Sequence, residues 1–237
     1  MNKIFILHGW TYSNVNIDPL KKWDLFIKFM ASKGTNPVLL RIPGLTTAID
    51  QVWNLEEYVK WLKKITDDEK GKVILIGHSN GGRIAFSFAE KYPDKISQLV
   101  LIDSAGVYHN ELPIRIKRFI FGNMAKLGKK ITTSETLKIL LYKLAREGDY
   151  GNALPAQRRT MLNLISTDLT GILSKIQVPT LIIWGQEDTT TPLEDGKLMH
   201  SLVKGSKLYV VKGAGHSPQF THTKEVADLI IKELPVV

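Results

Sequence analysis

Six short apolar runs alternate with amphipathic segments along the chain, and this alternation restricts the possible folds more than any other feature of the sequence. Uninterrupted runs such as VILI and TLIIW are typical of strands covered on both faces of a parallel sheet. We expect strands at Lys3–Leu7, Pro37–Ile42, Lys72–Ile76, Gln98–Ile102, Pro179–Trp184 and Ser206–Val211. We expect helices at Leu20–Ser32, Leu55–Ile65, Asn80–Lys91, Leu193–Leu202 and Lys224–Leu234. This order predicts right-handed crossovers and an open α/β sheet.

The alternation stops once, between Val107 and Lys175, where no strand pattern is present. Three helices are expected there, joined by turns rich in Gly, Asp and Asn: Leu112–Gly128, Thr133–Glu147 and Pro155–Thr167. A chain of 237 residues is a usual length for one α/β domain with an insertion. We therefore predict a core made of residues 1–106 and 176–237, and a helical cap made of residues 107–175.

The stretch VILIGHSNGGRIAF places Ser79 on the turn between an expected strand and an expected helix. A sharp turn of this kind strains its central residue, and side chains two positions before and after it would collide with neighbouring backbone. Gly77 and Gly81 remove both collisions. The Ser79 hydroxyl would then stand above the end of the sheet, beside the positive N-terminus of the following helix. We predict that Ser79 is a nucleophile.

A serine hydroxyl needs a base to take its proton, and the base needs an acid to orient it. His216 follows the last expected strand, in a glycine-rich loop that can reach back over the sheet, and is the expected base. Asp188 lies just beyond an expected strand and is the expected acid, because the usual chain order is serine, acid, histidine. Asp103, at the end of LVLID, is the competing acid. His8 and His78 are interpreted as turn residues beside the site, with His8 in the loop after the first strand.

Two backbone amides are needed to bind the oxyanion that forms during attack on a carbonyl, each worth about 3 kcal/mol in the transition state. One is expected from Asn80, directly after the nucleophile. The other is expected from Trp10, which follows the LHG stretch after the first strand.

These elements occur in an order that resembles the α/β-hydrolase superfamily, in particular its capped serine carboxylesterase-like hydrolases. The resemblance rests on HGW at 8–10, IPG at 42–44, GHSNGGRIA at 77–85, PTLIIWGQED at 179–188 and GAGHSPQF at 213–220. It implies a Ser79, Asp188 and His216 triad, an oxyanion hole made by the Trp10 and Asn80 amides, and a cap that selects substrates.

The chain departs from the superfamily pattern in two places. The superfamily usually has two further antiparallel strands before the HG strand, so we expect a sheet of about six strands with a different edge strand. The PGLTT stretch replaces the more common glycine–x–serine turn, and it leaves the adjoining pocket wall undefined.

The resemblance implies a serine hydrolase that cleaves carboxylic esters through an acyl-enzyme intermediate, with no cofactor or metal. Ser79 disfavours epoxide hydrolases and haloalkane dehalogenases, which have aspartate at this position. Three alternatives stay open: a carbon–carbon bond hydrolase, a cofactor-free perhydrolase, and a non-catalytic ligand-binding receptor. Carbon–carbon bond hydrolases often have asparagine where His78 stands.

Composition limits the remaining possibilities. The chain has no cysteine, which excludes a disulfide, a thiolate metal site and a cysteine nucleophile. No apolar run approaches the roughly 20 residues that span a bilayer. The apolar run at the N-terminus is shorter than the ~7–15 residues of a signal peptide, so a cytoplasmic protein without a transmembrane segment is expected.

The formal net charge is +9, and most of the surplus lies in the expected cap. Residues 107–175 contain 12 Lys and Arg against 5 Asp and Glu. This charge favours either an anionic ester substrate or anionic lipid, or else it is a solvated surface. No nucleic-acid motif accompanies it, so nucleic acid is not an expected partner. The sequence leaves the oligomeric state open.

Overall fold

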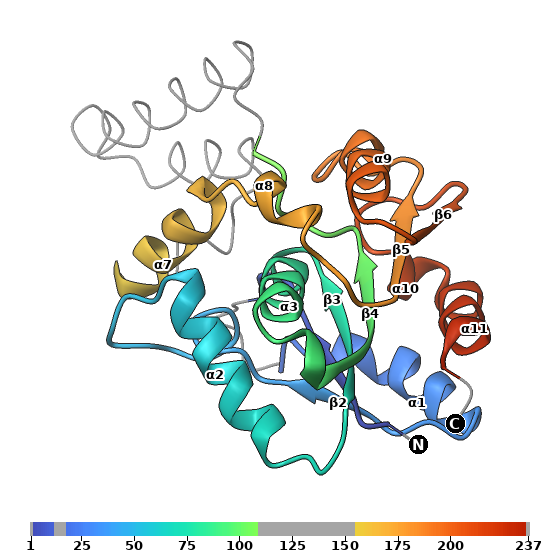
Figure 1. Cartoon of the computed structure of the whole chain (residues 1–237), viewed down its shortest axis with the longest axis horizontal. Coiled ribbons are helices and arrows are strands. Elements are labelled where there is room, and N and C mark those ends of the chain that lie inside the picture. Colours follow the sequence, from blue (N-terminus) through green and yellow to red (C-terminus); the bar gives the residue numbers. More distant parts are fainter. Residues whose placement is uncertain (1, 12–17, 109–154, 236–237) are drawn as a thin grey trace, which may run out of the picture.

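The protein is built around one six-stranded sheet in which every neighbouring pair of strands is parallel (Figure 1). The computed structural model describes residues 2–11, 18–108 and 155–235. The strand order is β2-β1-β3-β4-β5-β6. The strands are β1 (Ile4–Leu7), β2 (Pro37–Leu40), β3 (Val73–His78), β4 (Ile96–Ile102), β5 (Thr180–Gly185) and β6 (Lys207–Val211). The predicted fold class is confirmed, and all six strands lie where the apolar runs placed them.

Helices connect the strands and cover both faces of the sheet. The longer ones are α1 (Asp24–Ser32), α2 (Leu55–Asp67), α3 (Asn80–Lys91), α7 (Pro155–Ser166), α9 (Leu193–Leu202) and α11 (Thr223–Glu233). The short ones are η1 (Lys21–Trp23), η2 (Pro93–Lys95), α8 (Thr170–Leu173) and α10 (Pro218–Thr221). The predictions for α3 and α9 match the observed bounds, whereas α8, α10 and η2 were not predicted.

Alternate residues of each strand point into two separate apolar layers, as the twofold period of a strand requires. Phe5 and Leu7 face a layer that includes residues of α2, α3, α8 and α9. Ile4 and Ile6 face the opposite layer, which is formed with α1 and α11 (Figure 1). Both faces of β1 and β5 are therefore buried, and this explains uninterrupted apolar runs such as IFIL and LIIW in these strands.

The expected new edge strand is β2, which pairs with β1 and has no other strand beside it in the described part of the chain. It is four residues long and begins with Pro37, which has no backbone N–H to offer. Short edge strands and edge prolines both discourage pairing with another chain. β6 forms the opposite edge.

The segment that connects β4 to β5 has its two ends close together. The N–H of Leu169 donates to the carbonyl of Gly106 over 3.0 Å, and the N–H of Tyr108 lies 3.3 Å from the Asp168 carboxylate. We call residues 105–108 and 167–170 the neck. Two of the expected cap helices, Leu112–Gly128 and Thr133–Glu147, lie outside the described residues.

The third expected cap helix is α7, and it contacts the loop before α2. The N–H of Trp53 donates to the hydroxyl of Thr160 over 2.8 Å, and the amide of Asn163 lies 3.3 Å from the Trp53 carbonyl. Leu173 of α8 is buried in the same apolar layer as α3. The bounds of the cap at 107 and 175 stay a prediction. Among the described helices, none has the length and apolar character needed to cross a bilayer.

Candidate active site

Ser79 stands on the turn between β3 and α3 in a backbone conformation that few side chains adopt, with φ 53° and ψ −122°. A Cβ on Gly77 would lie 2.6 Å from the Cα of Gly82, and a Cβ on Gly81 would lie 2.1 Å from the carbonyl oxygen of Leu7. Both distances are far below van der Waals contact. The turn therefore requires glycine at both positions, for the steric reason expected from the sequence.

The structure brings the three predicted triad residues together in one line of hydrogen bonds. Nε2 of His216 lies 3.1 Å from Oγ of Ser79, and Nδ1 of His216 lies 2.7 Å from Oδ2 of Asp188. A carboxylate can only accept, so Nδ1 carries the proton and Nε2 is free to accept from the serine hydroxyl. Ser79 follows β3, Asp188 follows β5 and His216 follows β6, so the line runs along the carboxyl end of the sheet.

Asp188 is buried and fully hydrogen-bonded. Its Oδ1 accepts the N–H groups of Thr190 (2.7 Å) and Thr191 (3.0 Å), and its Oδ2 accepts the Thr191 hydroxyl (2.7 Å). Burial raises the pKa of Asp188, but the hydrogen bond and charge of His216 and the Thr190 and Thr191 donors outweigh burial and hold the pKa below its ordinary value. Asp188 is therefore ionised at neutral pH. Sequence reasoning missed both threonines, although an Asp followed by polar residues in DTTT is a typical Asx-turn signal.

Asp103, the competing acid, is fully buried and does not pair with the imidazole of His216 in the described structure. Its Oδ1 accepts the N–H of Gly185 over 2.8 Å. Its backbone has φ 42°, a left-handed conformation that is uncommon outside glycine. Burial raises the pKa of Asp103 to about 8, and the nearby charge of Asp188 adds to the effect.

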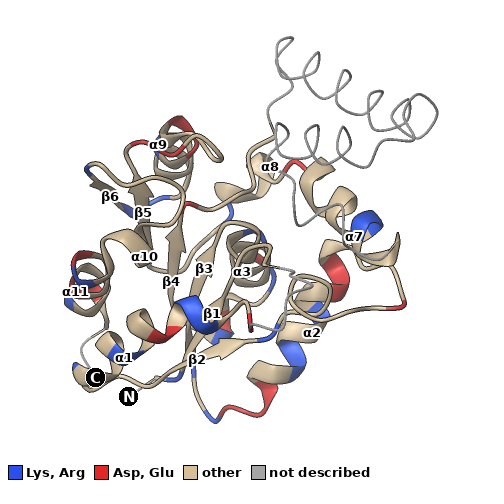
Figure 2. Cartoon of the chain, turned by 180° about the vertical axis from the view of Figure 1, so that it is seen from behind, with Lys and Arg blue, Asp and Glu red and all other residues tan. Residues whose placement is uncertain are grey.

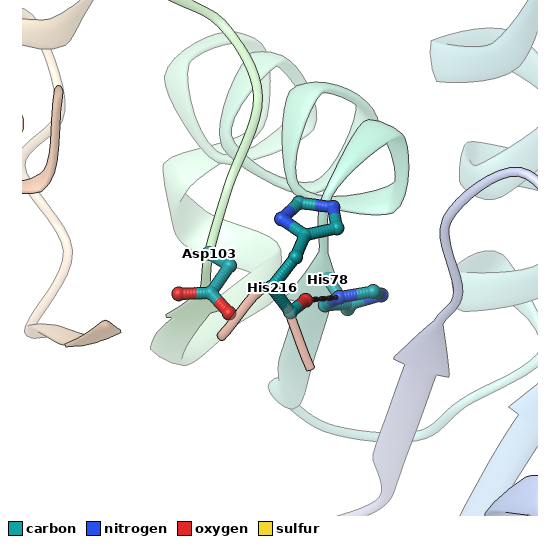
Figure 3. A group of neighbouring side chains, drawn as sticks. All are labelled: His78, Asp103 and His216. Atoms are coloured by element: carbon teal, nitrogen blue, oxygen red, sulfur yellow. Dashed lines mark hydrogen bonds between the residues drawn. The ribbon is translucent and has the colours of Figure 1, made fainter. Parts of the chain in front are cut away.

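Asp103, His78 and His216 form the one cluster in the described residues whose side chains could offer ligand atoms to a metal, with these atoms within 4.8 Å of one another (Figure 3). The two histidines already use ring nitrogens in other hydrogen bonds. Both ring nitrogens of His216 face Ser79 and Asp188, and Nε2 of His78 lies 2.8 Å from the carbonyl oxygen of His216. The donor set therefore fits proton transfer better than metal binding.

Both residues expected to supply oxyanion donors lie next to the nucleophile. Asn80 is the first residue of α3 and is buried. The loop after β1 lies against Ser79, because a Cβ on Gly9 would be 3.3 Å from Oγ of Ser79. Trp10 follows directly and packs on the apolar layer of α3. The donor roles of the two amides stay a prediction.

His78, which was interpreted as a turn residue, is the last residue of β3. His8 does lie in the loop after β1, and it is buried. Its Nδ1 lies 2.6 Å from the Gly9 carbonyl oxygen, and its Nε2 lies 2.5 Å from the hydroxyl of Thr46. Burial lowers the pKa of His8 to about 4, so its ring is neutral. The ring joins the loop after β1 to the PGLTT loop through Thr46.

Residues 48–221 match the protein family described as serine aminopeptidase, S33, and the chain belongs to this family of α/β-hydrolases. It is 25% identical over 245 residues to pimeloyl-(acyl-carrier protein) methyl ester esterase of Neisseria meningitidis, covering 97% of this chain and 92% of the relative. It is 26% identical over 249 residues to 2-hydroxy-6-oxononadienedioate/2-hydroxy-6-oxononatrienedioate hydrolase of Escherichia coli K12, covering 95% and 82%. The protein is therefore a hydrolase.

Solved structures show the same fold at low sequence identity. A bromoperoxidase from Bacillus anthracis is similar with a TM-score of 0.71 and 21% identity, over 98% of this chain and 91% of the other. A meta-cleavage product hydrolase from Pseudomonas fluorescens IP01 is similar with a TM-score of 0.69 and 20% identity, over 98% and 90%. The resemblance to the α/β-hydrolase superfamily inferred from the sequence is confirmed.

Proposed function

We propose that the protein is a serine hydrolase that cleaves carboxylic esters through an acyl-enzyme intermediate. The observation that carries the proposal is the line of hydrogen bonds from Ser79 through His216 to Asp188. A serine, an imidazole and a carboxylate in this geometry are the parts that nucleophilic acyl transfer needs.

In the proposed reaction, Oγ of Ser79 attacks the ester carbonyl while Nε2 of His216 takes the hydroxyl proton. The carboxylate of Asp188 stabilises the imidazolium that forms, and the amides of Trp10 and Asn80 bind the oxyanion. His216 then gives its proton to the leaving alcohol. In the second half, His216 deprotonates a water molecule that attacks the acyl-enzyme, and the acid is released with Ser79 restored.

An ester is proposed as the substrate because the Neisseria meningitidis relative is named as a methyl ester esterase and covers nearly the whole chain. A second candidate is hydrolysis of a carbon–carbon bond, favoured by the name of the Escherichia coli relative. Both reactions use the same serine and base. We further propose a small ester as substrate, residues 107–175 as a cap that selects it, and a cytoplasmic location.

Replacing the nucleophile tests the proposal. Ser79→Ala should lower turnover of p-nitrophenyl esters by about 10³–10⁶-fold without unfolding the protein. Ser201→Ala, at an exposed serine on α9, is the matched control and should leave turnover unchanged. A fluorophosphonate probe should label the wild type and the control but not Ser79→Ala.

Two outcomes would contradict the proposal. Full esterase activity in Ser79→Ala would remove Ser79 as the nucleophile. Turnover of a dienoate carbon–carbon substrate with no turnover of any p-nitrophenyl ester of graded chain length would favour the second candidate.

A further inference from the structure

The residue before the nucleophile makes a contact that the proposed mechanism does not use. His78 is the last residue of β3 and is buried. Its Nε2 lies 2.8 Å from the backbone carbonyl oxygen of His216, a residue 138 positions further along the chain (Figure 3). The hydroxyl of Ser217 lies 3.5 Å from the same nitrogen. The chain thus has a direct contact between the nucleophile turn and the backbone of the base.

The partner of His78 fixes its tautomer. A carbonyl oxygen can only accept a hydrogen bond, so Nε2 of His78 carries the proton and donates it. Burial, with a smaller contribution from His216, lowers the pKa of His78 to about 3, so the ring is neutral. A hydrogen bond in an apolar, water-poor environment is stronger than one in water.

Aromatic rings hold the imidazole of His78 in place. Its centroid lies 6.0 Å from that of Trp23 and 6.4 Å from that of Phe220, both in edge-on arrangements. Trp23 and Phe220 in turn lie edge to face at 4.9 Å. The ring therefore has little freedom to leave the carbonyl of His216.

His78 and Ser79, which are adjacent in the chain, both contact His216. Ser79 is joined covalently to His78, the His78 ring is hydrogen-bonded to the His216 backbone, and the His216 ring reaches back to Oγ of Ser79 over 3.1 Å. The loop that carries His216 is held on its other side by the hydrogen bond from the N–H of Glu187 to the carbonyl of Ala214, at 2.8 Å. His78 holds the loop at His216 itself.

We propose that His78 is a positioning residue: its Nε2–H group holds the backbone of His216 so that the imidazole of the base stays aligned with the Ser79 hydroxyl. The inference rests on the proposed function. Because His78 is buried and its ring packs against the imidazole of the base, with the centroids 5.1 Å apart, its loss should affect the chemical step more than substrate binding. A misplacement of about 1 Å in a catalytic group can cost roughly 100-fold in rate.

Two substitutions of equal side-chain length distinguish the loss of the hydrogen bond from the loss of the ring. Gln places an N–H donor the same number of bonds from the backbone as Nε2 of His, whereas Met has similar length and no donor. His78→Met should lower kcat for a p-nitrophenyl ester by about 10–100-fold and leave KM within about threefold. His78→Gln should keep kcat within about fivefold of the wild type. Turnover is normalised to active sites titrated with the fluorophosphonate probe.

Controls keep the result interpretable. His200→Met, at an exposed histidine of α9, should leave kcat and KM unchanged. If His78→Met does not fold, His78→Asn replaces it, because its amide donor is one bond too short to reach the carbonyl. The positioning role is overturned if the Met or Asn variant has wild-type kcat, or if His78→Gln is as impaired as they are. Ser79→Ala in the same assay separates this outcome from failure of the proposed function, which would appear as activity in that variant.

Discussion

Two aspartates follow neighbouring strands at the carboxyl end of the sheet, and their surroundings give them opposite protonation states. Asp188 accepts from two backbone N–H groups, a hydroxyl and His216, and its pKa lies below the ordinary value. Asp103 accepts from the N–H of Gly185, and burial raises its pKa to about 8. Only an ionised carboxylate can stabilise an imidazolium, so the environment selects Asp188 as the partner of His216.

The buried Asp103 carboxyl should make stability fall as pH rises. The folded protein keeps its proton up to about pH 8, whereas the unfolded chain releases it near pH 4, so the folded state binds more protons between these values. Asp103→Asn removes the titration and keeps an oxygen for Gly185. Its Tm relative to wild type should therefore rise between pH 5 and pH 8, by at least about 2 °C.

Thermal unfolding followed by circular dichroism at several pH values measures this difference. Glu187→Gln, at an exposed carboxylate, is the control and should show no such trend. A constant Tm difference between Asp103→Asn and wild type across the range would contradict the raised pKa.

The approach of Ser79, Asp188 and His216 could be predicted because each residue directly follows an apolar run, and parallel strands end at one edge of a sheet. The contacts of His78 and Thr191 could not be predicted from the sequence. Each contact depends on the direction in which a side chain points at the end of the sheet. The contact of His78 also joins residues more than 100 positions apart in the chain. A GHS stretch indicates the nucleophile but says nothing of the ring beside it.

At the scale of elements, the strand and helix positions could be predicted, but the ends of strands depend on their partners. The predicted β2 extends to Ile42, whereas the observed strand ends at Leu40, because Leu40 pairs with Leu7 and β1 ends there. β3 continues to His78 because Ile102 of β4 pairs with it. The short helices α8 and α10 were missed, since a single turn has no repeating apolar period to detect.

The helix that follows the nucleophile also contacts the neck of the insertion. Arg83 of α3 is buried, and one of its terminal nitrogens donates to the carbonyl of Thr167 over 2.7 Å. A hydrogen bond from a charged group contributes about 1.5–3 kcal/mol. The contact joins α3 to the end of the inserted segment.

Removing this contact should destabilise the protein. Arg83→Met should lower the free energy of unfolding by about 2 kcal/mol and Tm by about 4–8 °C. Lys91→Met, at the exposed end of the same helix, loses a surface ion pair with Glu56 and should shift Tm by about 2 °C or less. Equal shifts in the two variants, measured by thermal unfolding, would argue against a specific role of the neck contact.

At the scale of the whole molecule, the net charge of +9 is unevenly distributed along the chain. On α2, acidic and basic residues are interspersed (Figure 2), and exposed pairs such as Lys63 with Asp67 balance each other. Residues 107–175 instead hold 12 basic against 5 acidic residues, and most of them lie outside the described part. Long-range attraction of an anionic substrate by such a segment would be weakened by salt.

The effect of salt tests whether this surplus serves the substrate. If it does, KM for an ester with a free carboxylate should rise several-fold between about 0.01 M and 0.15 M salt, as the screening length falls from about 30 to 8 Å. KM for a neutral ester of equal length should stay constant and serves as the control. A flat response for both esters would leave the charge as a solvated surface.

The neck has a consequence for any exchange of the inserted segment that aims to change the substrate specificity. The inserted segment begins and ends at the hydrogen bond between Gly106 and Leu169. Ser79, Asp188 and His216 are held by hydrogen bonds among themselves at the ends of the strands. Helix α7 lies between these two points and contacts Trp53 and the side chain of Asn80, which follows the nucleophile. We therefore expect an exchange of this segment for that of another hydrolase to leave the reacting groups in place only if the new segment keeps these contacts.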